Sequence, residues 1–137
     1  MSTMLVYRVE NADQQGPYVG LWQRTGTDRE VCSALHEAHN APGARSTHPG
    51  PHRDQGLRRY FKYLHGFDMD SCIFGFSDRQ QLAQWFGGWG RQLQRAGYRV
   101  SVYRVPVAGV IGGQRQAIFA RHAAERVASL LPTRVLS

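Results

Sequence analysis

Residues 72–105 read CIFGFSDRQQLAQWFGGWGRQLQRAGYRVSVYRV, and this stretch decides the fold of the 137-residue chain. Its first five residues, 72–76, are mostly apolar and aromatic and predict a strand. Residues 98–105 alternate between apolar and polar side chains, as a half-exposed strand does, and Pro106 ends that strand. Between the two strands, apolar residues recur at helical spacing. The stretch therefore predicts a helix packed against a sheet.

The central helix carries signals for its start, its interior and its end. Residues 77–80, Ser-Asp-Arg-Gln, match a capping box with Ser77 as the capping residue. Gly97 stands where a helix C-cap is expected. Three glycines between residues 87 and 90 interrupt the helix interior, each at about 1 kcal/mol relative to alanine. We expect the helix to bend there, or another segment to approach it closely.

The same patterns predict further elements on both sides of this stretch. They predict strands over residues 5–9 and 116–119 and an apolar segment over 107–111. They also predict helices over residues 28–39, 57–64 and 123–131, and Pro132 closes the last of these helices. The order contains no regular βαβ repeat. The fold class is therefore α+β: one domain over residues 1–137, with a small mixed or antiparallel sheet of about four to five strands and three to four helices.

A long segment without apolar periodicity separates two of these helices. Residues 40–56 hold three prolines, three glycines and two histidines, and structureless loops of this length usually bind a partner or cover a site. Cations follow on the polar face of the helix predicted at 57–64. The predicted binding residues are His48, His52, Arg53, Arg58, Arg59 and Lys62.

The net charge and the composition indicate which kinds of partner the protein can bind. The net charge is +7, made almost wholly by arginine, with Lys62 as the only lysine. Such a charge favours an anionic partner, whether nucleic acid, a nucleotide or an acidic protein surface. The first residues carry neither a basic leader nor a long apolar run, so we expect a cytoplasmic protein with no membrane partner. Cys32 and Cys72 have apolar neighbours, which is typical of buried, reduced thiols.

No complete catalytic or metal-binding motif is present. His36, His39, His48 and His52 match no zinc signature, so we expect no metal site. Residues 112–116, Gly-Gly-Gln-Arg-Gln, lack the ending of a nucleotide phosphate loop and predict a glycine hairpin. The acidic residues are scattered singly. These observations favour a protein without enzymatic activity and without a cofactor.

Three short segments nevertheless resemble the motifs of ADP-ribosyltransferases. They are Tyr7-Arg8, residues 74–77 (Phe-Gly-Phe-Ser) and residues 113–119 (Gly-Gln-Arg-Gln-Ala-Ile-Phe). The resemblance implies that Arg8 holds a dinucleotide, that Ser77 supports a nicotinamide pocket, and that the cofactor is NAD. It also places Gln116 where the family has its catalytic glutamate, and a neutral amide stabilises a developing positive charge much less than a carboxylate does.

The chain is a small, arginine-rich domain with the segments Tyr7-Arg8-Val9-Glu10, Gly16-Pro17-Tyr18, Trp85-Phe86 and Val102-Tyr103. In this it is similar to small proteins encoded by bacteriophages and prophages, many of which are host-takeover or counter-defence factors, including anti-CRISPR proteins. The first hypothesis is therefore a non-enzymatic phage-type protein that binds and inhibits a bacterial protein or ribonucleoprotein complex through residues 40–56 and the adjoining cations. The alternatives are a possibly degenerate ADP-ribosyltransferase-like protein that binds NAD, and a nucleic-acid-binding protein driven by charge.

Overall fold

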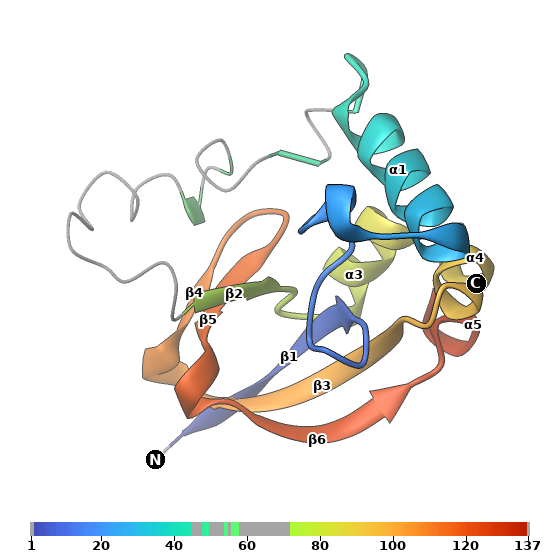
Figure 1. The fold of residues 1–137 in the computed structure, drawn as a ribbon. Coiled ribbons are helices and arrows are strands. Elements are labelled where there is room, and N and C mark those ends of the chain that lie inside the picture. Colours follow the sequence, from blue (N-terminus) through green and yellow to red (C-terminus); the bar gives the residue numbers. More distant parts are fainter. Residues whose placement is uncertain (1, 45–47, 50–53, 55, 58–71, 137) are drawn as a thin grey trace.

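The fold is described from a computed structural model, which describes residues 2–44, 48–49, 54, 56–57 and 72–136. In this part of the chain six strands form two antiparallel sheets, with helices packed around them (Figure 1). The α+β class predicted from the sequence is confirmed. The strands lie in two sheets of three, where the sequence predicted one sheet of about four to five strands.

The first sheet has the order β1-β3-β6 and the second the order β2-β5-β4. Their bounds are β1 Thr3–Glu10, β2 Cys72–Gly75, β3 Arg99–Pro106, β4 Val110–Gly112, β5 Ala117–Ala120 and β6 Glu125–Leu130. A short 3-10 turn, η4 (Val107–Gly109), leads from β3 into β4, and another, η5 (Arg121–Ala123), leads from β5 into β6.

The two sheets meet at one isolated bridge between Tyr7 and Phe76. The Tyr7 amide donates to the Phe76 carbonyl at 2.8 Å, and the Phe76 amide donates to the Tyr7 carbonyl at 2.7 Å. The second half of β1, from Val6 onward, packs on both of its faces. Val9 packs into the cluster under the helices, whereas Val6 packs with residues of the second sheet.

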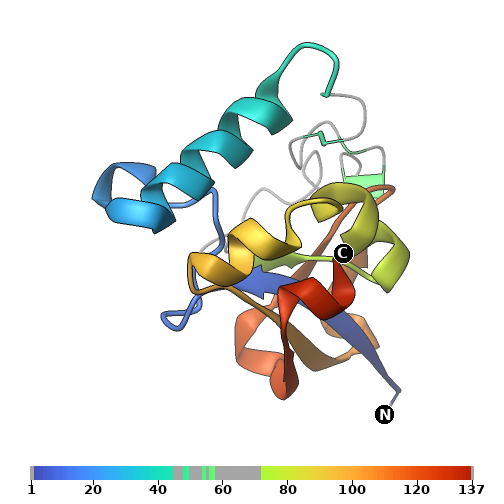
Figure 2. The same ribbon diagram turned by 90° about the vertical axis from the view of Figure 1, so that its right-hand side faces the viewer.

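The helices cover the hydrophobic cluster that contains Val9. They are α1 Gly26–Asn40, α3 Arg79–Phe86, α4 Gly90–Arg95 and α5 Pro132–Val135, and a 3-10 turn, η1 (Leu21–Gln23), precedes α1 (Figures 1 and 2). The predicted helix at 28–39 is confirmed with slightly wider bounds. Beyond Leu57, which is buried, the helix predicted at 57–64 lies outside the described residues.

The long central helix is broken into α3 and α4, as its glycines indicated. Gly88 adopts a φ of +86°, a conformation that only glycine reaches without strain. The start of the helix is shifted by one residue, because Asp78 and not Ser77 is the cap. The Asp78 carboxylate accepts the Gln81 amide at 2.8 Å, and the Gln81 side chain accepts the Ser77 amide at 3.0 Å.

The helix predicted over 123–131 is wrong. Residues 125–130 form β6, which pairs antiparallel with β3 from Glu125 opposite Arg104 to Leu130 opposite Val100. Pro132 begins α5 and does not close a helix. Local helix propensity is weak compared with a ladder of backbone hydrogen bonds on an open sheet edge, so the tertiary pairing prevails.

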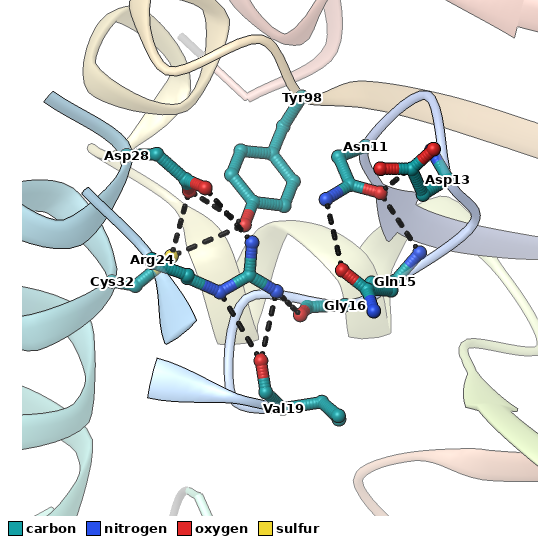
Figure 3. A network of polar contacts seen from close by, with 9 residues as sticks. All are labelled: Asn11, Asp13, Gln15, Gly16, Val19, Arg24, Asp28, Cys32 and Tyr98. Carbon is teal, nitrogen blue, oxygen red and sulfur yellow. Dashed lines mark hydrogen bonds and ion pairs between the residues drawn. The ribbon is translucent and has the colours of Figure 1, made fainter. Parts of the chain in front are cut away.

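A buried polar network ties the segment before α1 to the core (Figure 3). Arg24 donates to the carbonyls of Gly16 and Val19 and to the carboxylate of Asp28, all within 3.1 Å. Asp28 also accepts the Tyr98 hydroxyl at 2.9 Å. Helix α1 begins at Gly26 without a side-chain cap at Thr25, and the Asp28 side chain in its first turn points toward Tyr98.

The thiol of Cys32 belongs to the same network and is buried and free. Burial raises its pKa to about 11, so it stays protonated and unreactive at neutral pH. This agrees with the buried, reduced thiol that the sequence predicted for this residue.

Candidate functional site

A cavity of about 500 Å³ opens beside the junction of the two sheets. Its described walls come from the end of β1, residues 14–19, the second half of α1, β2 and α3. Residues 48 and 49 of the long loop also line it, together with Gln116 and Arg121 at the two ends of β5. The volume falls in the range of small-molecule sites, and segments far apart in sequence build it.

Aromatic rings form one wall of this cavity. His39 of α1 stacks on His48 with ring centroids 3.9 Å apart and planes 15° apart. Tyr18 lies 6.0 Å from Phe86 in a stacked arrangement, and Trp85 meets His48 edge-on at 4.9 Å. We call these five residues the aromatic wall. Several ring faces in one cavity suit a flat, aromatic ligand.

Hydrogen bonds fix the rings of the aromatic wall in place. The Trp85 indole N–H donates to the Tyr18 hydroxyl at 2.9 Å, and the Tyr18 hydroxyl bonds to Nδ1 of His39. Because an indole N–H can only donate, the Tyr18 proton is free to point at Nδ1, which makes His39 an acceptor and neutral. Burial, followed by the charge on His48, lowers the pKa of His39 to about 4.

The lining of the cavity also includes two arginines. Arg8 is 8% exposed, donates to Glu10 and to the Phe74 carbonyl at 2.9 and 2.7 Å, and so lies between the two sheets. Burial lowers the pKa of Arg8, and the neighbouring carboxylate of Glu10 opposes this effect. Arg121 is exposed at the rim, where it donates to Gln14 at 3.2 Å.

Two of the three residues that resemble transferase motifs meet in this cavity. Arg8 and Gln116 line it, whereas Ser77 does not. The reason is local, because Ser77 precedes the Asp78 cap of α3 and lies near Gly112. Of the predicted binding residues, His48 lines the cavity. The others, His52, Arg53, Arg58, Arg59 and Lys62, lie outside the described residues.

Gln116 has a specific structural partner. Its side-chain amide donates to the Pro49 carbonyl at 2.9 Å, and the residue is 6% exposed. A glutamate at this position would present a carboxylate oxygen to that carbonyl, with no hydrogen to share. The amide therefore holds residue 49 over the cavity, which explains why a glutamine fits here.

This contact gives a direct prediction for Gln116→Glu. We expect the substitution to lower the free energy of unfolding by about 2 kcal/mol at pH 7, because a buried donor is lost and a charge is buried without a partner. Chemical denaturation measures the change, and Gln84→Glu on the exposed face of α3 is the control. A loss no larger than that of the control would show that the contact with Pro49 does not matter.

The glycine hairpin predicted at residues 112–116 is confirmed, and its backbone donors do converge on an anion. That anion is the chain's own Asp54. Its carboxylate accepts the amides of Gln114, Arg115 and Gln116 at 2.6, 2.8 and 3.2 Å. It also accepts the Gly56 amide at 3.1 Å. Asp54 thus fills the site that a phosphate would need.

Sequence reasoning missed Tyr18, Trp85 and Asp54 as parts of this region. Tyr18 lies in a turn without a motif, and Trp85 reads as one member of an apolar helical stripe. The one available signal was the glycine hairpin, whose backbone donors can converge on an anion. Nothing in the sequence identified Asp54 as that anion.

No group of three or more histidines, cysteines or carboxylates among the described residues is placed to hold a metal ion. No helix in that part of the chain is both long and apolar enough to cross a bilayer.

Comparisons with known proteins place the chain in a phage family. No curated protein and no solved structure gives a significant match. A family model described as bacteriophage T4 Y00F protein matches residues 4–133, which is nearly the whole chain. The phage-type character predicted from the sequence is therefore confirmed, and the chain belongs to the bacteriophage T4 Y00F protein family.

Proposed function

We propose that this phage protein binds a nucleotide of the NAD type in the cavity beside the sheet junction, without transferring its ADP-ribose. The observation that carries the proposal is that one cavity of about 500 Å³ brings together the aromatic wall, Arg8 and Gln116. Two of the motif-like segments, far apart in sequence, supply Arg8 and Gln116.

The two sides of the cavity match the two parts of such a ligand. A flat nicotinamide or adenine ring stacks on the aromatic wall, and base stacking on aromatic side chains contributes about 1–3 kcal/mol per base. The phosphates lie toward Arg121 at the rim and Arg8 behind it. Guanidinium groups bind phosphate oxygens through paired, charge-assisted hydrogen bonds.

The charges around the cavity support binding rather than catalysis. Among the described lining residues there is no aspartate or glutamate. Arg121, which is exposed at the rim, attracts an anionic ligand, whereas the charge of Arg8 is paired with Glu10. It offers no carboxylate to stabilise the positive charge that develops on the ribose when the bond to nicotinamide breaks.

Calorimetric titration with NAD tests this proposal. We expect a saturable signal, and Arg121→Gln is expected to weaken the affinity about fivefold to tenfold by removing a phosphate contact at the rim. Arg126→Gln removes the same charge from an exposed position on β6 and serves as the matched control. Absence of binding at millimolar NAD, or equal weakening by both variants, would contradict the proposal.

A second candidate is inhibition of a bacterial protein or ribonucleoprotein complex in the cytoplasm of the host, in the manner of a counter-defence or anti-CRISPR protein. Membership of a phage family and the net charge of +7 favour it. The proposed interface comprises residues 40–56 together with Arg58, Arg59 and Lys62. Charge reversal at Arg58 and Arg59 is expected to abolish retention of the host complex from nuclease-treated lysate, and unchanged retention would exclude this interface.

A further inference from the structure

A second hollow lies between α4 and α5, where the cavity beside the sheet junction does not reach. Its volume is about 570 Å³. Figures 1 and 2 both show α5 beside α4, near the C-terminal end of the chain. The lining includes Gly88, Gly90, Arg91, Arg95, Thr133 and Leu136.

The walls of this hollow are held together firmly. Gln94 of α4 accepts both the backbone amide and the hydroxyl of Thr133, at 3.2 and 2.7 Å. The Gly88 amide donates to the Leu136 carbonyl at 3.3 Å. A side chain at position 90 would meet the Pro132 carbonyl at 3.0 Å, so the close packing of the two helices depends on Gly90. These contacts fix α4 and α5 relative to each other, so the hollow between them is a constant feature of the fold.

Two cations stand on its rim, and no described carboxylate forms an ion pair with either of them. Arg91 and Arg95 are exposed on α4, and four residues of helix separate them by about 6 Å along the axis. In the described residues the ion pairs are Arg8–Glu10, Arg24–Asp28 and Arg104–Glu125. None of them involves Arg91 or Arg95, so both guanidinium groups can bind an external anion.

We propose that this hollow, with Arg91 and Arg95, binds the phosphate backbone of single-stranded nucleic acid. Guanidinium groups one helical turn apart suit the repeated phosphates of an extended strand. The proposed contacts are to phosphates, which carry no sequence information, and the described lining contains no aromatic ring on which a base could stack. An acidic protein partner would need exposed apolar anchors, and Leu136, the one large apolar lining residue described, is buried.

The test measures the salt dependence of binding to a fluorescein-labelled oligothymidylate by anisotropy, from 50 to 200 mM NaCl. We expect Arg91→Gln with Arg95→Gln to weaken binding at least tenfold at the lower salt. The slope of log affinity against log salt should fall by about 1.4, since each phosphate contact on a single strand contributes roughly 0.7. The control is Arg29→Gln with Arg126→Gln, which removes two exposed charges elsewhere.

Three outcomes would overturn the proposal. The first is no binding of the oligonucleotide by the unaltered protein. The second is equal weakening by both double variants, which would mean that net charge alone is responsible. The third is binding of polyglutamate as tight as that of the oligonucleotide, which would indicate an acidic protein partner. NAD titration of the Arg91 and Arg95 double variant should be unchanged, so this test is separate from that of the cavity.

Discussion

Replacing Asp54 by alanine is expected to lower the free energy of unfolding by about 3 to 5 kcal/mol, with a fall in melting temperature of roughly 10 °C or more. Asp54 is 1% exposed, and its carboxylate accepts four backbone amides. Removing it leaves the buried Gln116 amide and three partly buried amides without this acceptor, and a fully buried donor without a partner costs about 1–3 kcal/mol. Thermal and chemical denaturation measure the change.

Two further variants test whether the loss of stability comes from the Asp54 carboxylate. Asp54→Asn keeps the size of the side chain but offers one acceptor oxygen in place of two, so we expect an intermediate loss. Asp13→Ala removes an exposed carboxylate in the turn after β1 and should change the stability by less than about 0.5 kcal/mol. If Asp54→Ala lost no more than Asp13→Ala, the backbone donors of the hairpin would have another partner.

Acidification is expected to destabilise the protein through His39. The pKa of His39 is about 4 in the folded chain and 6.5 in its unfolded reference state. The unfolded chain therefore binds the proton more readily, and stability falls as the pH drops from about 6.5 toward 4. Between pH 7 and pH 4.5 the loss from this one group is about 2 to 3 kcal/mol.

His39→Asn tests this linkage, because the asparagine oxygen can take the place of Nδ1 as acceptor for Tyr18 and does not titrate. The informative quantity is the difference in unfolding free energy between pH 7 and pH 4.5, which is independent of any constant loss caused by the substitution. We expect that difference to shrink by about 2 kcal/mol in His39→Asn and to stay unchanged in His36→Gln, on the exposed face of the same helix. Equal pH profiles for the native chain and His39→Asn would show that His39 is protonated without penalty.

The elements that depend on local signals could be predicted from the sequence. The strands around Val9, Phe74 and Val102 have the composition and alternation of buried strands, and their positions are confirmed. The break between α3 and α4 follows from the glycines between residues 87 and 90, whose backbone freedom is a local property.

The features that depend on distant pairing could not be predicted in this way. Residues 125–130 carry an ambiguous pattern, and only the open edge of β3 makes them a strand. Asp54 reaches its partners about sixty residues later, so no local signal connects them. The aromatic wall joins Tyr18, His39 and Trp85 from three separate segments. The local sequence around each of these residues is typical of an ordinary hydrophobic core. Arg8 and Gln116 were found only through a resemblance to motifs.

The narrow junction of the two sheets also limits how this chain can vary. A side chain at position 75 would meet the Tyr7 carbonyl at 2.7 Å and the Val6 side chain at 2.9 Å. Even alanine would therefore force β1 and β2 apart at the Tyr7–Phe76 bridge between the sheets, and the shape of the adjoining cavity would change with it. Substitutions around the rim of the cavity can change which ligand binds without disturbing the fold. A substitution at Gly75 would instead shift both sheets at once.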